Sequence, residues 1–194
     1  LAVNPKLGAR SVADLIRLAK EKPATIAYAS SGSGTTLHLS AALFELAAGV
    51  ELVHVPYKGS APALIDLLGG QVQIIFDNLA TALPHIQAGK LTPLAVTSSR
   101  RTAQLPGVST MQEAGLAGYE VTSWYALYAP AHTPPAVAQR LNAEVRKAIA
   151  LPAVAERLRE QGLQPASGSA AQLAALTRAE IAKEAVAMGP DGPV

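Results

Sequence analysis

A run of glycines and hydroxyl residues at positions 30–36 is the segment best suited to hold a ligand. It follows a short β-prone run and precedes a helical pattern, so it is predicted to link a strand to a helix N-terminus. Its glycines let the backbone approach a ligand closely, and the amides of Thr35, Thr36 and Leu37 would lack an acceptor inside the helix. Such a helix start favours an anion. The alternative is that these residues only cap a helix and turn the chain.

The spacing of the residues gives little support for a catalytic role of this loop. No Lys-Ser or Lys-Thr follows the glycines as a nucleotide P-loop requires, and the G-x-S-x-G pattern is not matched. A hydrolase triad could be drawn from Ser33, Asp77 and His85, but a chain of this length offers such a trio by chance. The four histidines show no metal-binding spacing. We therefore expect no catalytic residue, no metal and no cofactor.

Two further loops follow predicted strands and carry polar side chains. Tyr57 and Lys58 follow one strand, and Asp77 follows the next. Ligands of open α/β sheets bind at the carboxyl ends of the strands, so a hydroxyl, a positive charge and a carboxylate are expected at that edge. The alternatives are a solvated lysine at Lys58 and an ordinary turn or helix cap at Asp77. The aromatic pair Trp124 and Tyr125 could line a cleft or fill a core.

Composition excludes several classes of protein. The chain has 194 residues, of which 49% are hydrophobic and 15% charged, a balance typical of a compact globular protein. Its formal net charge is only +2 and the basic residues are scattered, so nucleic acid is not an expected partner. No apolar run reaches the length of about 18 residues that a membrane span needs. The absence of cysteine rules out disulfides and thiol chemistry.

Hydrophobic periodicity in the first half of the chain predicts helices alternating with strands. The predicted helices cover residues 11–20, 37–46, 61–68 and 82–88, and the predicted strands cover 25–29, 52–55, 72–76 and 94–97. This alternation over short loops predicts an α/β fold with a parallel sheet covered on both faces.

The second half of the chain has a different character. A capping box at Thr110 and Glu113 predicts a short helix, and residues 121–129 are predicted to form a long strand that joins two lobes. Helices are then expected from Pro135 to about residue 150, from Pro152, and from a cap at Ser169, before a frayed end at 189–194. The predicted domains are therefore 1–122 and 123–194.

Several of these segments together resemble one family of transport receptors. Residues 30–39, 53–63, 67–72 and 76–78 are similar to motifs of the Bug (TctC-like) family of periplasmic solute-binding proteins, which serve tripartite tricarboxylate transporters. The similarity continues through 88–91, 94–98, 113–115 and 129–130 into 140–142, and so covers nearly the whole chain in register.

The resemblance implies a type II periplasmic binding protein, or Venus-flytrap, fold and a receptor that is not an enzyme. Such a receptor captures a small carboxylate, namely a dicarboxylate, a tricarboxylate or an aromatic acid, and delivers it to the membrane permease subunits. The residues of this sequence that match the family's binding loops are Ser31, Gly32, Ser33, Gly34, Thr35, Tyr57, Lys58 and Asp77. No membrane-spanning segment, nucleic acid or cofactor is implied.

The same resemblance implies how the lobes are divided and where the protein works. Residues 1–122 would form the second, ligand-binding lobe. Residues 123–194 would form the crossover strand and the C-terminal helical part of lobe one, whose N-terminal part precedes Leu1 together with a signal peptide for export to the periplasm. The alternative is a ligand-sensing domain of a transcriptional regulator, which would carry a helix-turn-helix upstream.

Overall fold

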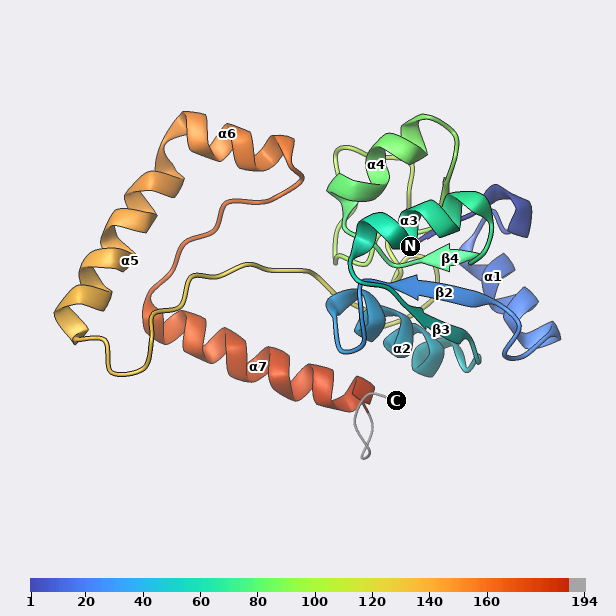
Figure 1. Ribbon diagram of the computed structural model, residues 1–194, viewed down its shortest axis with the longest axis horizontal. Helices are drawn as coiled ribbons and strands as arrows, with labels where there is room; N and C mark the ends of the chain where they lie inside the picture. The colour runs from blue at the N-terminus through green and yellow to red at the C-terminus, as the bar shows by residue number, and fades with distance from the viewer. Residues whose placement is uncertain (189–194) are drawn as a thin grey trace. The chain divides into compact units, whose positions relative to one another are not determined.

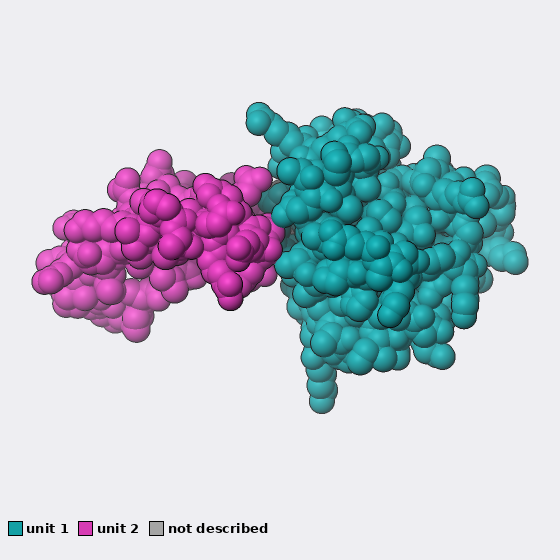
Figure 2. All heavy atoms as spheres, turned by 90° about the horizontal axis from the view of Figure 1, so that it is seen from above, with its two compact units in different colours: residues 1–123, 185–194 teal, residues 124–184 magenta. Residues whose placement is uncertain are grey.

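A computed structural model describes residues 1–188, including every side chain except those at 183, 184 and 186–188 (Figure 1). The chain forms two compact units (Figure 2). The first contains Leu1–Ser123 and the stretch from Ala185 onward, and the second contains Trp124–Glu184. The predicted frayed end at 189–194 lies outside the described residues.

The first unit is built on a five-stranded sheet with the order β3-β2-β4-β1-β5. Its strands are β1 Ala2–Val3, β2 Ala27–Ser30, β3 Val53–Pro56, β4 Ile74–Ile75 and β5 Thr92–Pro93. The central strand β2 is parallel to β3 and β4, whereas β1 is antiparallel to β4 and β5. The prediction of a wholly parallel sheet was therefore wrong, because β1 was not foreseen.

Helices cover both faces of this sheet, as the sequence predicted. They are η1 Pro5–Leu7, α1 Val12–Glu21, α2 Thr36–Ala48, α3 Ser60–Gly69 and α4 Leu79–Gln87 (Figure 1). Neighbouring residues of one strand point to opposite faces. Tyr28 packs with Phe44 of α2 in the larger core, whereas Ala29 packs with Leu67 of α3 in the smaller one. The α/β class is thus confirmed.

The first helix illustrates why the sequence folds locally as predicted. The Ser11 hydroxyl accepts a hydrogen bond from the Asp14 amide at 3.0 Å, which caps α1. Val12, Leu15 and Ala19 then recur at helical spacing and are buried against the sheet. Cap and apolar stripe together fix the helix and its orientation.

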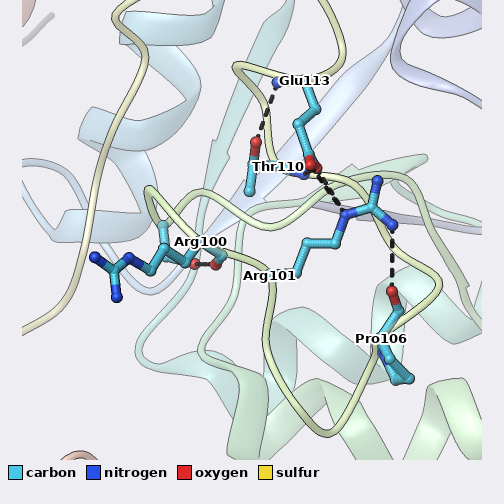
Figure 3. A network of polar contacts seen from close by, with 6 residues as sticks. Arg100, Arg101, Pro106, Thr110 and Glu113 are labelled. Atoms are coloured by element: carbon cyan, nitrogen blue, oxygen red, sulfur yellow. Dashed lines mark hydrogen bonds and ion pairs between the residues drawn. The ribbon is translucent and has the colours of Figure 1, made fainter.

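The segment after β5 differs from its prediction. The predicted strand 94–97 is not part of a regular strand: Val96 forms an isolated parallel bridge to Thr110, and its neighbours make single backbone hydrogen bonds to Leu1 and Val121. The Thr110 amide donates to Glu113 and the Glu113 amide donates back to the Thr110 hydroxyl, and Arg101 ties Glu113 to the Pro106 carbonyl (Figure 3). The predicted capping box is therefore present, but it closes a turn and no helix follows.

The second unit is helical, apart from the segment that leads into it. Residues 121–129 form no helix and belong to no strand in the described part of the chain, so the predicted long strand was wrong: its residues favour extended backbone but no neighbouring strand binds them. The helices α5 Pro135–Ala150, α6 Pro152–Glu160 and α7 Ala170–Met188 confirm the predicted pattern. Ser169 and Gln172 form the expected capping box.

This unit carries almost no core of its own. Among its described residues only Ala155 is a buried hydrophobic, and Tyr125 and Tyr128 are 73% and 64% exposed. The aromatic side chains of residues 124–128 therefore do not fill a core within this unit. The predicted site residues all lie in the first unit.

Candidate functional site

Three loops meet at the carboxyl ends of the parallel strands β2, β3 and β4. The loop after β3 is tied to the end of β2 by the Tyr57 amide, which donates to the Ser30 carbonyl at 3.0 Å, and it lies against Gly32 of the loop after β2. The loop after β3 is tied to the loop after β4 by the Ser60 hydroxyl, which donates to Asp77 at 3.0 Å. The predicted site residues of all three loops are thus brought to one edge of the sheet.

Three helices begin at this same edge. They are α2, α3 and α4, which follow the three loops directly. Their N-cap residues, Thr35, Gly59 and Asn78, make no side-chain cap hydrogen bond. The start of a helix carries a partial positive charge and N–H groups that have no acceptor within the helix. The edge is therefore favourable for an anion.

The structure shifts the donors of α2 by one residue from their predicted position. The Thr35 amide donates to the Gly32 carbonyl at 3.3 Å, and the Thr35 hydroxyl donates to the same oxygen at 2.7 Å. Because Thr35 is the N-cap, the amides of Thr36, Leu37 and His38 are the first-turn donors. They find no acceptor among the described residues.

Glycine is required by the backbone of this loop. Gly32 has φ 134° and Gly34 has φ 74°, a region that L-residues with side chains rarely adopt. A Cβ atom at Gly32 would lie 3.6 Å from the Tyr57 carbonyl oxygen, so the two loops pack closely there. Between the glycines, Ser33 is exposed, and its hydroxyl bonds to no described protein group.

Tyr57 and Lys58 face different surroundings. The Tyr57 hydroxyl donates to the Asp66 carboxylate of α3 at 2.7 Å. Burial, together with that carboxylate, raises the pKa of Tyr57 to about 12, so the hydroxyl stays protonated and committed to Asp66. The Lys58 side chain is exposed and forms no ion pair within the described part of the chain. Of the two, Lys58 retains a group free to meet a ligand.

Asp77 holds the loops together. One carboxylate oxygen accepts from the Ser60 hydroxyl and from the Asn78 amide at 2.9 Å, and the other accepts from the Thr81 hydroxyl at 2.7 Å. The carboxylate thereby satisfies donors at the start of α4, which stabilises a negative charge there. Neither Asp77 nor Ser33 bonds to a histidine in the described residues, so the alternative triad with His85 is not assembled.

A stack of three rings beneath the glycine loop was missed by sequence reasoning. His38 and His54 stack with ring centroids 4.0 Å apart, and Tyr28 stacks on His54 at 4.9 Å. His38 Nδ1 accepts from the Gly34 amide at 3.0 Å, and His54 Nε2 lies 2.7 Å from the Ser30 hydroxyl. Pairing of the predicted strands at 25–29 and 52–55 is the signal that could have found part of this stack, because the β2–β3 register places Tyr28 opposite His54.

Burial sets the protonation of this stack. His38 and Ser30 are buried and His54 is half-buried. Burial lowers the pKa of His38, and burial together with His38 lowers the pKa of His54 to about 4. Both imidazoles are therefore neutral at neutral pH. No group of three or more possible metal ligands occurs in the described part of the chain.

Comparison with known proteins identifies the family. The profile of the family described as "Tripartite tricarboxylate transporter family receptor" matches residues 1–188. The chain belongs to this receptor family. It is 44% identical over 172 residues to the UPF0065 protein in the tcbD-tcbE intergenic region of Pseudomonas sp. strain P51, covering 88% of this chain and 51% of that protein. It is 38% identical over 184 residues to protein BugT of Bordetella pertussis, covering 95% and 55%. The chain thus spans about half the length of these relatives.

Solved structures of the family confirm the predicted fold. The R. palustris protein Rpa4515 with adipate superposes with a TM-score of 0.88 at 41% identity, covering 96% of this chain and 63% of that one. MatC from Rhodopseudomonas palustris with bound malate superposes with a TM-score of 0.87 at 28% identity, covering 96% and 64%. The chain therefore has the periplasmic binding protein fold. Within residues 1–188, no helix has both the length and the apolar character that crossing a membrane demands.

Proposed function

We propose that the protein is an extracytoplasmic receptor that captures a small carboxylate and delivers it to the permease subunits of a tripartite tricarboxylate-type transporter. The observation that carries this proposal is the convergence on one edge of the sheet of three helix N-termini whose N-cap residues make no side-chain cap hydrogen bond. Relatives of known structure hold adipate and malate, both dicarboxylates. A carboxylate at this edge would accept hydrogen bonds from backbone donors.

The binding residues are those of the three loops. We assign to the binding site Ser31, Gly32, Ser33, Gly34, Thr35, Tyr57, Lys58 and Asp77. Within this set, the exposed hydroxyl of Ser33 and the ammonium of Lys58 have the freest side chains, whereas Tyr57 and Asp77 shape the edge through their bonds to Asp66 and Ser60. Each helix N-terminus contributes about 0.3–1 kcal/mol to binding of an anion. Binding therefore depends on peptide dipoles more than on a buried ion pair.

The location and the lobe assignment follow from the same proposal. The protein works in the periplasm, without catalytic activity, and residues 1–122 are its second lobe. Residues 123–194 are the crossover segment and the C-terminal helical part of lobe one. Capture then consists of lobe closure, a shift of population driven by contacts that only the closed form makes.

Calorimetry on the full-length protein tests the proposal. Adipate, malate, citrate and benzoate are titrated against the folded protein, with adipamide as an uncharged control of the same length as adipate. We expect at least one acid to release heat and the diamide to release none. If no acid binds while circular dichroism shows an intact fold, the proposed function is wrong.

A further inference from the structure

The stacked histidines contact both ends of the glycine loop. His38 reaches Gly34 directly, since its Nδ1 atom accepts from the Gly34 amide at 3.0 Å. His54 reaches Gly32 through Ser30, whose hydroxyl lies 2.7 Å from His54 Nε2 and accepts from the Gly32 amide at 3.2 Å. Gly32 and Gly34 are the two residues whose backbone shapes the loop.

We propose that His38, stacked on His54, is a positioning residue that holds the ligand loop in its binding conformation only while its imidazole is neutral, so that the receptor releases its carboxylate in acid. This inference rests on the proposed function and deepens it by assigning regulation to the same site. The histidines do not contact the ligand in this proposal. They act through Gly34 and, by way of Ser30, through Gly32.

The hydrogen bond at Gly34 defines the protonation state of His38. Because Nδ1 is the acceptor, the single proton of the neutral ring is on Nε2. Adding a proton at Nδ1 would set two N–H groups against each other across 3.0 Å, and the bond would be lost. Gly34 would then be free to leave φ 74°, and the loop would lose its preorganised shape.

The close stacking of the two rings disfavours a second protonation of the histidine pair. Two charged imidazoles with centroids 4.0 Å apart repel each other, so the pair accepts one proton far more readily than two. The titratable groups on the elements packed against the pair are few. Tyr28 of β2 stacks on His54, Glu45 of α2 lies near Tyr28, and Tyr119 donates to the Ser40 carbonyl of α2.

The surroundings favour the neutral pair at neutral pH. Burial is the first cause of the lowered pKa of both rings, and the value for His54 is about 4 against an ordinary 6.5. A group whose folded pKa is lowered contributes stability above its unfolded pKa and loses that contribution as the pH falls towards the folded value. The loop is therefore expected to be held above about pH 6.5 and released progressively below it.

Substitution of asparagine for His38 separates this role from a purely structural one. His38→Asn places a carboxamide oxygen near the Nδ1 position, where it accepts from Gly34 but does not titrate. His38→Leu removes the acceptor altogether. His85→Asn is the matched control, because His85 belongs to α4 and is outside the stack.

Two measurements on the full-length protein decide the matter. Adipate affinity is measured by calorimetry from about pH 7.5 to about pH 4.5, and ¹⁵N NMR follows the Gly34 amide and the His38 ring without ligand over the same range. As the pH falls, we expect the adipate affinity of wild type to decrease at least about tenfold more than that of His38→Asn. This factor corresponds to the loss of one buried hydrogen bond. Adipate's own protonation affects both proteins equally. His85→Asn should follow the wild type, and His38→Leu should bind weakly even at pH 7.5.

The outcomes distinguish this inference from the proposed function. Three results would overturn the inference. They are identical pH profiles of affinity for wild type and His38→Asn, tighter binding of adipate by wild type in acid, and a Gly34 amide signal that does not change as His38 titrates. A different result would separate the two proposals: adipate and the other acids bind at no pH, but the Gly34 amide signal changes as His38 titrates. The receptor proposal would then be wrong, while the role of His38 in positioning the loop would be supported.

Discussion

The Ser60 hydroxyl donates to one oxygen of Asp77 at 3.0 Å and thereby joins the loop after β3 to the loop after β4. The same oxygen accepts the Asn78 amide at the start of α4. An acidic side chain in an anion site is unfavourable by charge alone. Its position is explained by these bonds, which fix two of the three helix N-termini relative to each other.

Replacing Asp77 separates its charge from its hydrogen bonds. We expect Asp77→Ala to weaken carboxylate binding about tenfold, because the loss of a half-buried acceptor that holds three hydrogen bonds is worth about 1 kcal/mol or more and the loops become less ordered. Asp77→Asn keeps an oxygen for Ser60 but removes the charge, so it should bind as tightly as wild type or tighter. Calorimetry with adipate compares the variants. Equal affinity of the alanine and asparagine variants would contradict the assigned role.

Backbone donors are expected to matter more than the lysine. At Gly34, with φ 74°, a β-branched side chain is strained by at least about 1–2 kcal/mol, so Gly34→Val should lower carboxylate affinity about tenfold or more. Lys58→Ala removes an exposed charge and should cost less than about threefold, because exposed ion pairs are weak.

Gly107→Val is the matched control for the glycine variant. The backbone of Gly107 is outside the left-handed region, and a Cβ added there meets nothing within 4 Å. The carboxylate affinity of Gly107→Val should therefore equal that of wild type. Titration with adipate and malate provides the measurement, with circular dichroism to confirm folding. A larger loss at Lys58 than at Gly34 would reverse the ranking and make the site an ion-pair site.

Sequence patterns predicted the parts of the fold that local chemistry determines. Ser11 with Asp14, and Ser169 with Gln172, form the caps that their spacing indicates, and α1 buries the apolar stripe that its periodicity predicts. The run at 121–129 shows the limit of this reasoning. Its residues favour extended backbone, but a strand needs a partner, and no local pattern reveals whether one is available.

Non-local contacts explain what the sequence did not reveal. Strand β1 is only Ala2–Val3, too short for any periodicity, and forms because it fits between β4 and β5. His38 and His54 are far apart along the chain, and they meet only because α2 packs its first turn over the β2–β3 pair. The three loops of the proposed site were predictable as a group, since their strands are parallel and adjacent, whereas the histidines beneath them were not.

The pH dependence of stability can be tested at Glu113. Its pKa is lowered from the ordinary 4.5, first by the hydrogen bond from the Thr110 amide and then by Arg101. A carboxyl group with a lowered folded pKa contributes stability above its unfolded pKa and loses it as the pH falls through the folded value. We therefore expect Glu113→Gln to lose less stability than wild type between about pH 5 and about pH 2.5, measured by urea unfolding.

Arg101→Met gives the internal comparison for this measurement. It removes the ion pair but leaves the Thr110 amide, so most of the wild-type acid sensitivity should remain (Figure 3). If Arg101→Met abolishes the acid sensitivity as completely as Glu113→Gln does, the arginine is the principal cause and the capping bond is secondary.

The Tyr57 hydroxyl provides the sharpest test of which predicted residue touches the ligand. Sequence reasoning offered this hydroxyl as a donor to the anion, yet it donates to Asp66 at 2.7 Å. Tyr57→Phe should therefore change adipate affinity less than about twofold and lower the free energy of unfolding by about 1 kcal/mol, the worth of one hydrogen bond to a carboxylate that remains partly solvated. Calorimetry and urea unfolding measure the two effects. A loss of affinity without a loss of stability would mean that the hydroxyl turns from Asp66 to the ligand when the site is filled.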